Sequence, residues 1–326
     1  MTAVTAEDLR NMQPLREANR TVGDPAKTLQ MMEEDGYVFF HDVLDHGAVG
    51  RLRQHFMDVL VDWGYVDPGA REPIWNGKDL SDFPVKIEPL HDDRVWEEFV
   101  ADPAIEAFFT KLLGAPPFWL EITEYRLTPP GETLPPDPFI GRHQDAFYNM
   151  GMECFTCWIP LMEIDENIGG LAVLPGLHKG DFFHNRDDPP QYRIPPGALP
   201  DNWHRSLYHA GDMVMFHKMT PHSGLPNTSD RFRMSMDIRV APITGELPII
   251  GEILAFTDDE ILIGAPGGKE HRLVIDAETY SRWTGGKRIS TAETLLGLAS
   301  GPTVGVRLPT IAGSRTPFRE RVTRGR

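Results

Sequence analysis

Apolar residues follow two different spacings along the chain. Between residues 47 and 63, and again between residues 93 and 113, they recur at helical intervals, which predicts amphipathic helices with one buried face. A β-branched and aromatic run at residues 36–40 predicts a strand. Beyond residue 114 the apolar residues gather in short runs that predict further strands, at residues 119–127, 140–147, 154–162, 171–174, 212–216 and 232–240.

Glycine and proline residues separate these short runs. Many short strands with such turns predict a β sandwich or barrel, here with helices at its flank. We expect three regions: a flexible polar segment at residues 1–25, a mainly β unit with N-terminal helices at residues 26–245, and a C-terminal extension at residues 246–326 of unclear role. A proline-rich stretch at residues 186–200 predicts a long surface loop.

Charge and cysteine content narrow the possible partners and location. Acidic residues outnumber basic residues, 48 to 32, so the formal net charge is −16. A surface of this sign repels phosphate backbones and anionic lipids, so we expect neither nucleic acid nor membrane as a partner. The two cysteines, Cys154 and Cys157, are too few for a disulfide framework and suit a reducing compartment. Because no signal peptide is recognisable, a cytoplasmic location is expected.

The segment Gly141-Arg142-His143-Gln144-Asp145 holds the most informative pair of residues. On an extended strand, side chains two positions apart point to the same face, so His143 and Asp145 would lie side by side. One imidazole and one carboxylate supply two thirds of the facial triad that binds non-haem Fe(II). Taken alone, the pair is better explained as an ordinary surface His-x-Asp. Downstream, His217 and His222 are the candidates for a third ligand.

A strict alternation of apolar and polar residues follows at residues 231–239. The apolar positions predict one buried strand face, and an amphipathic strand with one wet face would explain the pattern. Because this strand is one of the last in the predicted β core, so many charges on it favour instead a cavity that these side chains line. The polar face carries Arg231, Arg233, Ser235, Asp237 and Arg239.

Taken together and in this order, these pieces resemble the phytanoyl-CoA dioxygenase-like family of Fe(II)/2-oxoglutarate oxygenases. The resemblance extends from about residue 36 to about residue 240, and Arg233 follows His222 by 11 residues, as in that family. The matching segments are His143-Gln144-Asp145, Trp158-Ile159-Pro160-Leu161, Asn167 to Leu171, Leu174 to Lys179, Gly211-Asp212, His222, and Asn227 to Ser235.

The resemblance implies a mainly β fold with flanking helices around a double-stranded β-helix, the jelly-roll core of cupin-like proteins. It implies that His143, Asp145 and His222 bind Fe(II), with His222 preferred to His217. It also implies that Arg233 grips the distal carboxylate of 2-oxoglutarate, a task suited to a bidentate guanidinium.

Three further residues receive roles from the resemblance. Ser235 lies two residues beyond Arg233 on the same strand face and adds a hydroxyl donor for the cosubstrate. Lys86 helps to hold the cosubstrate carboxylate, and Trp158 walls its pocket. A solvated lysine and a core tryptophan are the ordinary alternatives for these two. Some relatives carry a hydroxyl two residues past the distal histidine, where this chain has Gly224.

The implied reaction uses Fe(II), 2-oxoglutarate and O2 to hydroxylate, or otherwise oxidise at a C–H bond, a small organic substrate, releasing succinate and CO2. Halogenating relatives have Ala or Gly in place of the carboxylate ligand, so Asp145 favours a hydroxylase. Two alternatives stay open: a cupin-like metal-dependent isomerase or hydrolase, which needs no arginine for a cosubstrate, and a non-catalytic small-molecule binding protein on the same barrel. Candidate lid segments are residues 147–150, residues 186–200 and the extension.

Overall fold

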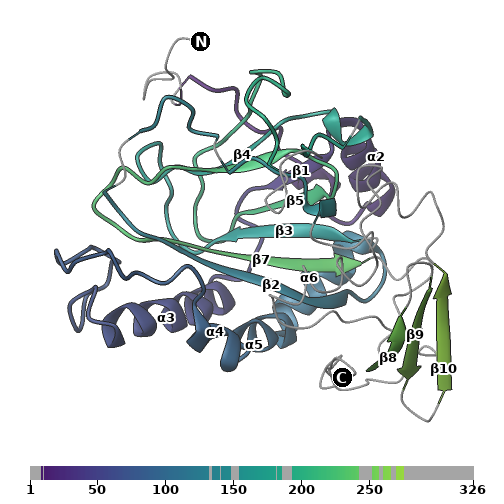
Figure 1. The fold of residues 1–326 in the computed structure, drawn as a ribbon, viewed down its shortest axis with the longest axis horizontal. Helices are drawn as coiled ribbons and strands as arrows, with labels where there is room; N and C mark the ends of the chain where they lie inside the picture. Colours follow the sequence, from purple (N-terminus) through teal and green to yellow (C-terminus); the bar gives the residue numbers. More distant parts are fainter. Residues whose placement is uncertain are drawn as a thin grey trace.

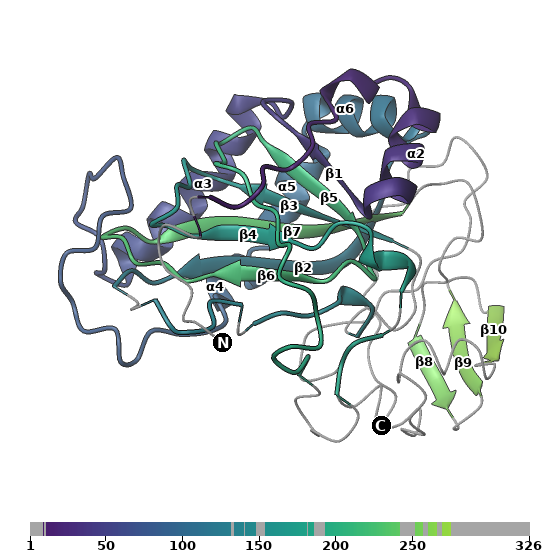
Figure 2. The same ribbon diagram turned by 90° about the horizontal axis from the view of Figure 1, so that it is seen from above.

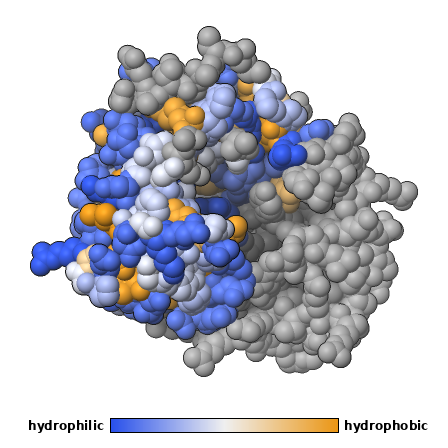
Figure 3. Space-filling model, turned by 60° about the vertical axis from the view of Figure 1, so that its left-hand side comes forward, coloured by the Kyte–Doolittle hydropathy of each residue, from blue (hydrophilic) through white to orange (hydrophobic). Residues whose placement is uncertain are grey.

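The computed structural model describes residues 9, 11–131, 134–139, 141–147, 154–180, 182–185 and 193–241, and three strands at residues 252–256, 260–265 and 269–274. Figure 1 shows antiparallel sheets with helices packed at one side. The described surface in Figure 3 is mostly hydrophilic, with hydrophobic residues scattered across it. Of the helices that the structure describes, none has the length and apolar character that crossing a bilayer requires.

Two antiparallel sheets form the β core. The larger one has five strands in the spatial order β1 (Tyr37–Phe40), β5 (Met213–His217), β3 (Phe155–Pro160), β7 (Arg233–Ala241) and β2 (Phe118–Thr128). The smaller one pairs β4 (Gly170–Val173) with β6 (His222–Leu225), and single bridges from His143 to His222 and from Val173 to His204 extend it. Arg233 of β7 reaches the smaller sheet and donates to the Leu225 carbonyl at 2.6 Å. These sheets correspond to the predicted double-stranded β-helix.

Strand β7 has two chemically different faces, as its alternating sequence predicts. Met234, Met236 and Ile238 are at most 1 % exposed and lie on the face that the helices cover. The polar residues Arg233, Ser235, Asp237 and Arg239 lie on the other face, toward the smaller sheet, where charged side chains lose contact with bulk water. The barrel interior beside β7 is therefore polar, which fits a binding site better than a packed apolar core.

Helices cover the apolar face of the larger sheet (Figures 1 and 2). The ring of Phe56 meets that of Tyr125 on β2 at 5.9 Å between centroids, and the ring of Phe109 meets that of Trp119 at 4.6 Å. These aromatic contacts attach the helices to the sheet and bury their apolar stripes. The helices are α2 (Pro25–Asp35), α3 (His46–Asp62), α4 (Glu88–Asp92), α5 (Val95–Ala101) and α6 (Pro103–Leu113).

The predicted helical region at residues 93–113 is divided into α5 and α6 at Asp102. Pro103 disfavours a helical backbone in the residue before it, and Asp102 is extended, with φ −63° and ψ 129°. The Asp102 side chain then caps α6 by accepting a hydrogen bond from the Ala104 N–H at 2.8 Å. The boundary is thus set by a capping residue followed by proline at the first helical position.

Two predicted segments differ from the structure. The predicted strand at residues 140–147 makes one bridge, at His143, and then turns into the short 3-10 helix η2 (Asp145–Phe147). Residues 11–25, expected to be flexible, pack on the core: Ala18 is 1 % exposed, and its N–H donates to the Phe39 carbonyl at 2.7 Å. The described part of the N-terminal segment therefore belongs to the folded unit.

The extension contributes a separate three-stranded antiparallel sheet, visible apart from the five-stranded sheet in Figure 1. Its strands are β8 (Glu252–Phe256), β9 (Glu260–Ala265) and β10 (Lys269–Val274). The rest of the extension lies outside the described residues. So do residues 148–150, most of the first candidate lid segment, and residues 186–192, about half of the second.

Candidate active site

Three side chains from two distant parts of the sequence meet at the end of the smaller sheet. The backbones of His143 and His222 exchange two hydrogen bonds, of 2.9 and 3.0 Å, which set their rings 4.2 Å apart between centroids. Oδ1 of Asp145 lies 3.4 Å from Nε2 of His143 and 3.5 Å from Nε2 of His222. These separations suit three ligands of one metal ion, since each ligand atom can reach a common point about 2 Å away.

Backbone carbonyls fix the tautomer of both histidines. Nδ1 of His143 lies 2.8 Å from the Gly141 carbonyl oxygen, and Nδ1 of His222 lies 3.0 Å from the Thr220 carbonyl oxygen. A carbonyl oxygen can only accept, so both Nδ1 atoms carry the proton and both Nε2 atoms present a lone pair toward Asp145. This is the arrangement that metal-binding histidines usually have.

The two oxygens of the Asp145 carboxylate have different partners. Oδ2 accepts hydrogen bonds from Thr156 Oγ1 and from Arg239 Nη2, the latter at 3.0 Å, so Oδ1 is left facing the histidines. Burial by itself raises the pKa of Asp145, but the charge of Arg239, joined in acid by that of protonated His222, outweighs it and holds that pKa well below the ordinary value. Asp145 is therefore a charged, oriented ligand.

Burial and the neighbouring His143 lower the pKa of His222 to about 4. His222 is consequently neutral near pH 7 and available as a ligand. Two neutral imidazoles and one carboxylate form the donor set that holds Fe(II) in facial triads and leaves positions open. The residues present thus fit a ferrous ion.

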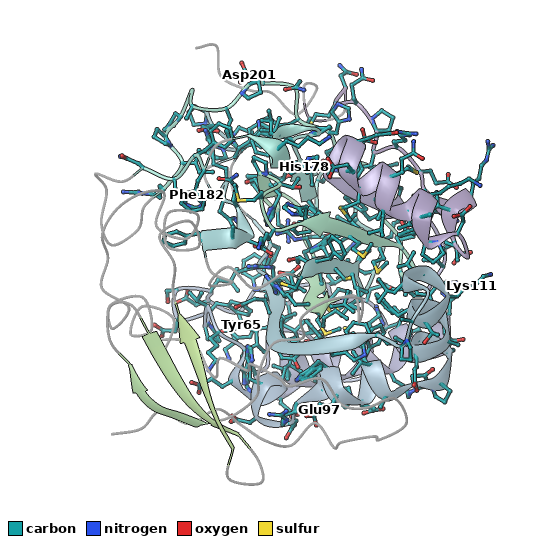
Figure 4. The ribbon with its side chains drawn as sticks, turned by 90° about the vertical axis from the view of Figure 1, so that its right-hand side faces the viewer. Tyr65, Glu97, Lys111, His178, Phe182 and Asp201 are labelled. Carbon is teal, nitrogen blue, oxygen red and sulfur yellow. The ribbon has the colours of Figure 1, made fainter. Side chains whose placement is uncertain are left out.

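Gln144, between the two ligands of the His-x-Asp segment, anchors that segment. Its N–H donates to Nε2 of His184 at 3.0 Å, and its side-chain carbonyl accepts from the Phe183 N–H at 2.8 Å. His184 in turn stacks on Phe147 and on Phe182, labelled in Figure 4, at 4.7 and 4.8 Å between centroids. These contacts fix the turn at η2 that brings Asp145 toward the histidines. Sequence patterns gave no signal for this cluster.

The other candidate ligand, His217, lies elsewhere. Its Nδ1 accepts from the Met219 N–H at 3.1 Å, and its ring lies 5.6 Å from that of His178, labelled in Figure 4. A second group of metal-ligand type, His41, His209 and Asp212, links the end of β1 to the start of β5. The Asp212 carboxylate already accepts hydrogen bonds from two backbone N–H groups, those of Asp42 and His209, each at 2.9 Å. Its role is therefore structural, since it joins these two segments.

Arg233 lies inside the barrel, 7 % exposed. Its Nη1 donates to the carbonyl oxygens of Ile168 at 3.2 Å and Leu225 at 2.6 Å, which orient the guanidinium. Gly224, where some relatives have a hydroxyl, leaves room beside it: a Cβ there would lie 3.4 Å from Nη2 of Arg233. The guanidinium is thus a fixed cation facing the polar interior.

Ser235 and Trp158 lie on the same interior face as Arg233. The Ser235 hydroxyl is fully buried and has no hydrogen-bond partner among the described residues. Such a group costs about 1–3 kcal/mol unless a ligand satisfies it. Trp158, 4 % exposed, sits opposite Asp237 and packs edge-on against Tyr208 at 4.7 Å between centroids. An orphaned hydroxyl beside a fixed guanidinium fits a bound carboxylate.

Lys86 is the one predicted site residue that the structure places away from this group. It is exposed, and its charge contributes to lowering the pKa of His91, whose ring packs on Tyr125 at 4.7 Å between centroids. Tyr125 belongs to the helix-covered face of the larger sheet, opposite the barrel interior. Phe83, three residues earlier, stacks on Phe232 and holds this segment on that side.

The family follows from a comparison of the whole domain. Residues 32–235 match the family model for phytanoyl-CoA dioxygenase (PhyH), which covers more than half of the chain. The chain belongs to the phytanoyl-CoA dioxygenase family. The matched range contains the three clustered ligands and the Arg233 and Ser235 pair, as the sequence motifs predict.

The chain is also similar to individual proteins. The chain is 29 % identical over 224 residues to a 1-deoxypentalenic acid 11-beta-hydroxylase of Streptomyces arenae, spanning 64 % of this chain and 78 % of the relative. It is 24 % identical over 245 residues to a probable phytanoyl-CoA dioxygenase of Caenorhabditis elegans, spanning 66 % and 75 %. Among solved structures, the epimerase SnoN in complex with Fe3+, alpha ketoglutarate and nogalamycin RO has a TM-score of 0.47 and 22 % identity, over 68 % of this chain and 86 % of that one.

Proposed function

We propose that this phytanoyl-CoA dioxygenase family member is an Fe(II)- and 2-oxoglutarate-dependent hydroxylase of a small organic molecule, with His143, Asp145 and His222 as its iron ligands. The strongest support is that the two oxygens of the Asp145 carboxylate have different surroundings. Oδ1 faces the Nε2 atoms of the two histidines, while Oδ2 accepts hydrogen bonds from Thr156 and Arg239. A carboxylate bound in this way is pre-oriented for a metal. The low cysteine content favours a cytoplasmic location.

We assign the cosubstrate to Arg233 and Ser235. The Arg233 fork offers charge-assisted hydrogen bonds to the distal carboxylate of 2-oxoglutarate, and the buried Ser235 hydroxyl adds a donor. Trp158 forms one wall of the cosubstrate pocket and keeps water from Arg233 and Ser235. When bound, iron and 2-oxoglutarate supply the oxidising chemistry, in which O2 is reduced and succinate and CO2 are released.

The remaining roles belong to groups that hold these residues. Thr156 and Arg239 keep Asp145 charged and oriented, and the Gly141 and Thr220 carbonyls keep both imidazoles in the ligating tautomer. Because Asp145 retains its carboxylate, hydroxylation rather than halide transfer is the reaction that this donor set supports. Positioning of this kind accounts for most of what a protein adds to metal-centred chemistry.

Anaerobic titration with Fe(II) and 2-oxoglutarate tests the proposal. We expect the wild type to develop the weak visible charge-transfer band of a chelated 2-oxo acid, and His222→Ala to lose it. Arg233→Ala should form the band only at higher 2-oxoglutarate concentration. A folded wild type that binds Fe(II) without a band, and releases no succinate in air, would instead favour a metal-dependent isomerase or hydrolase. Absence of iron binding would favour a non-catalytic binding protein.

A further inference from the structure

One charged residue of the barrel interior has no role in the site described above. Arg126 on β2 lies directly opposite Ser235 on β7, and cross-strand partners share a sheet face, so it faces the polar interior. Its Nε donates to Oδ2 of Asp237 at 2.7 Å. The charge of Asp145, a proposed iron ligand, also contributes to raising the pKa of Arg126. Arg126 therefore lies within electrostatic reach of the metal site.

Only one edge of the Arg126 guanidinium is used. Within the described part of the chain its two Nη atoms, which carry four N–H donors, have no hydrogen-bond partner, and the side chain is 43 % exposed. Arg239, on the same interior face, is by contrast 4 % exposed and bonded to Asp145. Asp237 holds Arg126 in place and leaves its outer edge available to a ligand.

Charges of both signs line the interior around Arg126. Three guanidinium groups, those of Arg126, Arg233 and Arg239, face the carboxylates of Asp145 and Asp237. The two positive charges of Fe(II) and the two negative charges of 2-oxoglutarate cancel. Glu124 of β2 is exposed, as Arg126 is, and its negative charge also contributes to raising the pKa of Arg126. The outer edge of the Arg126 guanidinium, with its N–H donors, is therefore the part that remains for a ligand.

The cosubstrate does not account for Arg126. The distal carboxylate of 2-oxoglutarate is assigned to Arg233 and Ser235, and its 2-oxo acid end to the iron. We propose, on the basis of the proposed function, that Arg126 binds a carboxylate of the substrate, so that the enzyme oxidises a C–H bond of an organic monoacid. A planar guanidinium with one edge held by Asp237 offers a carboxylate its other edge, as a bidentate contact.

A pair of probes that differ in charge tests this inference. Cyclohexanecarboxylate and the neutral cyclohexanecarboxamide are titrated anaerobically into protein loaded with Fe(II) and saturating 2-oxoglutarate, and binding is followed through the change in the visible band. We expect the wild type to bind the acid about 10-fold or more tightly than the amide, since a charge-assisted contact is worth that much. Arg126→Gln should bind both equally weakly, with its affinity for 2-oxoglutarate unchanged.

The chain offers a matched control. The Arg231 side chain is 42 % exposed and forms an ion pair with Asp230 at 3.5 Å, whereas Arg126 pairs with Asp237. Arg231→Gln therefore removes the same charge at a position that does not contact Asp237, and it should keep the preference for the acid. Because Arg126→Gln leaves Asp237 buried without its partner, the double variant Arg126→Gln/Asp237→Asn is measured alongside it. The same loss of preference is expected in both.

Three results would overturn the inference. One is a wild type without preference for the acid, and a second is a folded Arg126 variant that keeps it. The third is an Arg126→Gln protein whose 2-oxoglutarate affinity falls as far as that of Arg233→Ala, because Arg126 would then belong to the cosubstrate site. A wild type that forms no 2-oxoglutarate band refutes the proposed function itself, and these outcomes are therefore distinguishable.

Discussion

The hydroxyl of Thr156 offers a sharp test of how Asp145 is held. Thr156→Val removes one oxygen and keeps the branched shape of a side chain that is 1 % exposed. The lost hydrogen bond has a charged acceptor, Oδ2 of Asp145, which would keep only Arg239 as a partner. Hydrogen bonds to charged groups are worth about 1.5–3 kcal/mol, so we expect the free energy of unfolding of the metal-free protein to fall by that amount. Looser orientation of the carboxylate should also weaken Fe(II) binding about 10-fold.

Chemical denaturation and anaerobic Fe(II) titration measure the two effects. Thr123→Val is the matched control, because the Thr123 hydroxyl on β2 is buried and has no hydrogen-bond partner in the described structure. Exchanging an unsatisfied hydroxyl for a methyl group should leave stability unchanged or raise it by about 1 kcal/mol. Equal stability and equal iron affinity in the two valine variants would refute the role of Thr156 in holding the ligand.

Three further changes have defined outcomes. In Gly169→Ala, at φ +88°, the new Cβ would lie 2.6 Å from the Leu225 carbonyl oxygen that orients Arg233, so we expect the free energy of unfolding to fall by at least about 2 kcal/mol. The control Gly176→Ala, at φ +77° with open space around it, should lower the free energy of unfolding by less. Equal losses in the two variants would contradict the steric cause. Burial and the Lys86 charge lower the pKa of His91 to about 4, so the unfolded chain binds this proton first and stability should fall as pH drops from about 6.5 to 4. His222 contributes to the slope over the same pH range. His91→Phe should therefore reduce the slope without abolishing it, and an unchanged slope would contradict the role of His91. Arg233→Lys should raise the dissociation constant for 2-oxoglutarate about 10-fold in the band titration, because an ammonium cannot form the bidentate contact, and an unchanged constant would remove Arg233 from the cosubstrate site.

The spacing of apolar residues predicted much of the fold, because the buried face of a helix or a strand recurs at a regular interval along the sequence. Strand β7 follows its alternation residue by residue, and α3, at His46–Asp62, lies within one residue of its predicted range of 47–63 at either end. The three proposed ligands have a different basis: a metal needs particular donor atoms, and the order of His143, Asp145 and His222 along the chain matches the family pattern. The family resemblance selected His222 over His217, which spacing alone did not.

The groups that hold the ligands were not predictable in the same way. Thr156 and Arg239 are cross-strand neighbours, and their meeting at Asp145 depends on the register of β3 against β7, which one sequence does not reveal. The convergence of His143 and Asp145 also has a different cause from the predicted strand: the chain turns at η2 after a single bridge. Lys86 was assigned to the cosubstrate site because its position in the sequence matches a lysine of some family members. The packing of Phe83 on Phe232 instead places the Lys86 segment on the opposite side of the larger sheet from the barrel interior.

The contact between Arg239 and Asp145 restricts how this centre can evolve. A substitution that shortened Asp145 to alanine would vacate a ligand position and at once remove a carboxylate partner of a guanidinium that is 4 % exposed. Removing one member of a buried ion pair costs about 3–5 kcal/mol, a large part of the stability of a typical domain. A descendant that abandoned the carboxylate would have to recruit a mobile anion into the vacancy or replace Arg239 in the same lineage. Unless such an anion is recruited, the two positions should therefore change together.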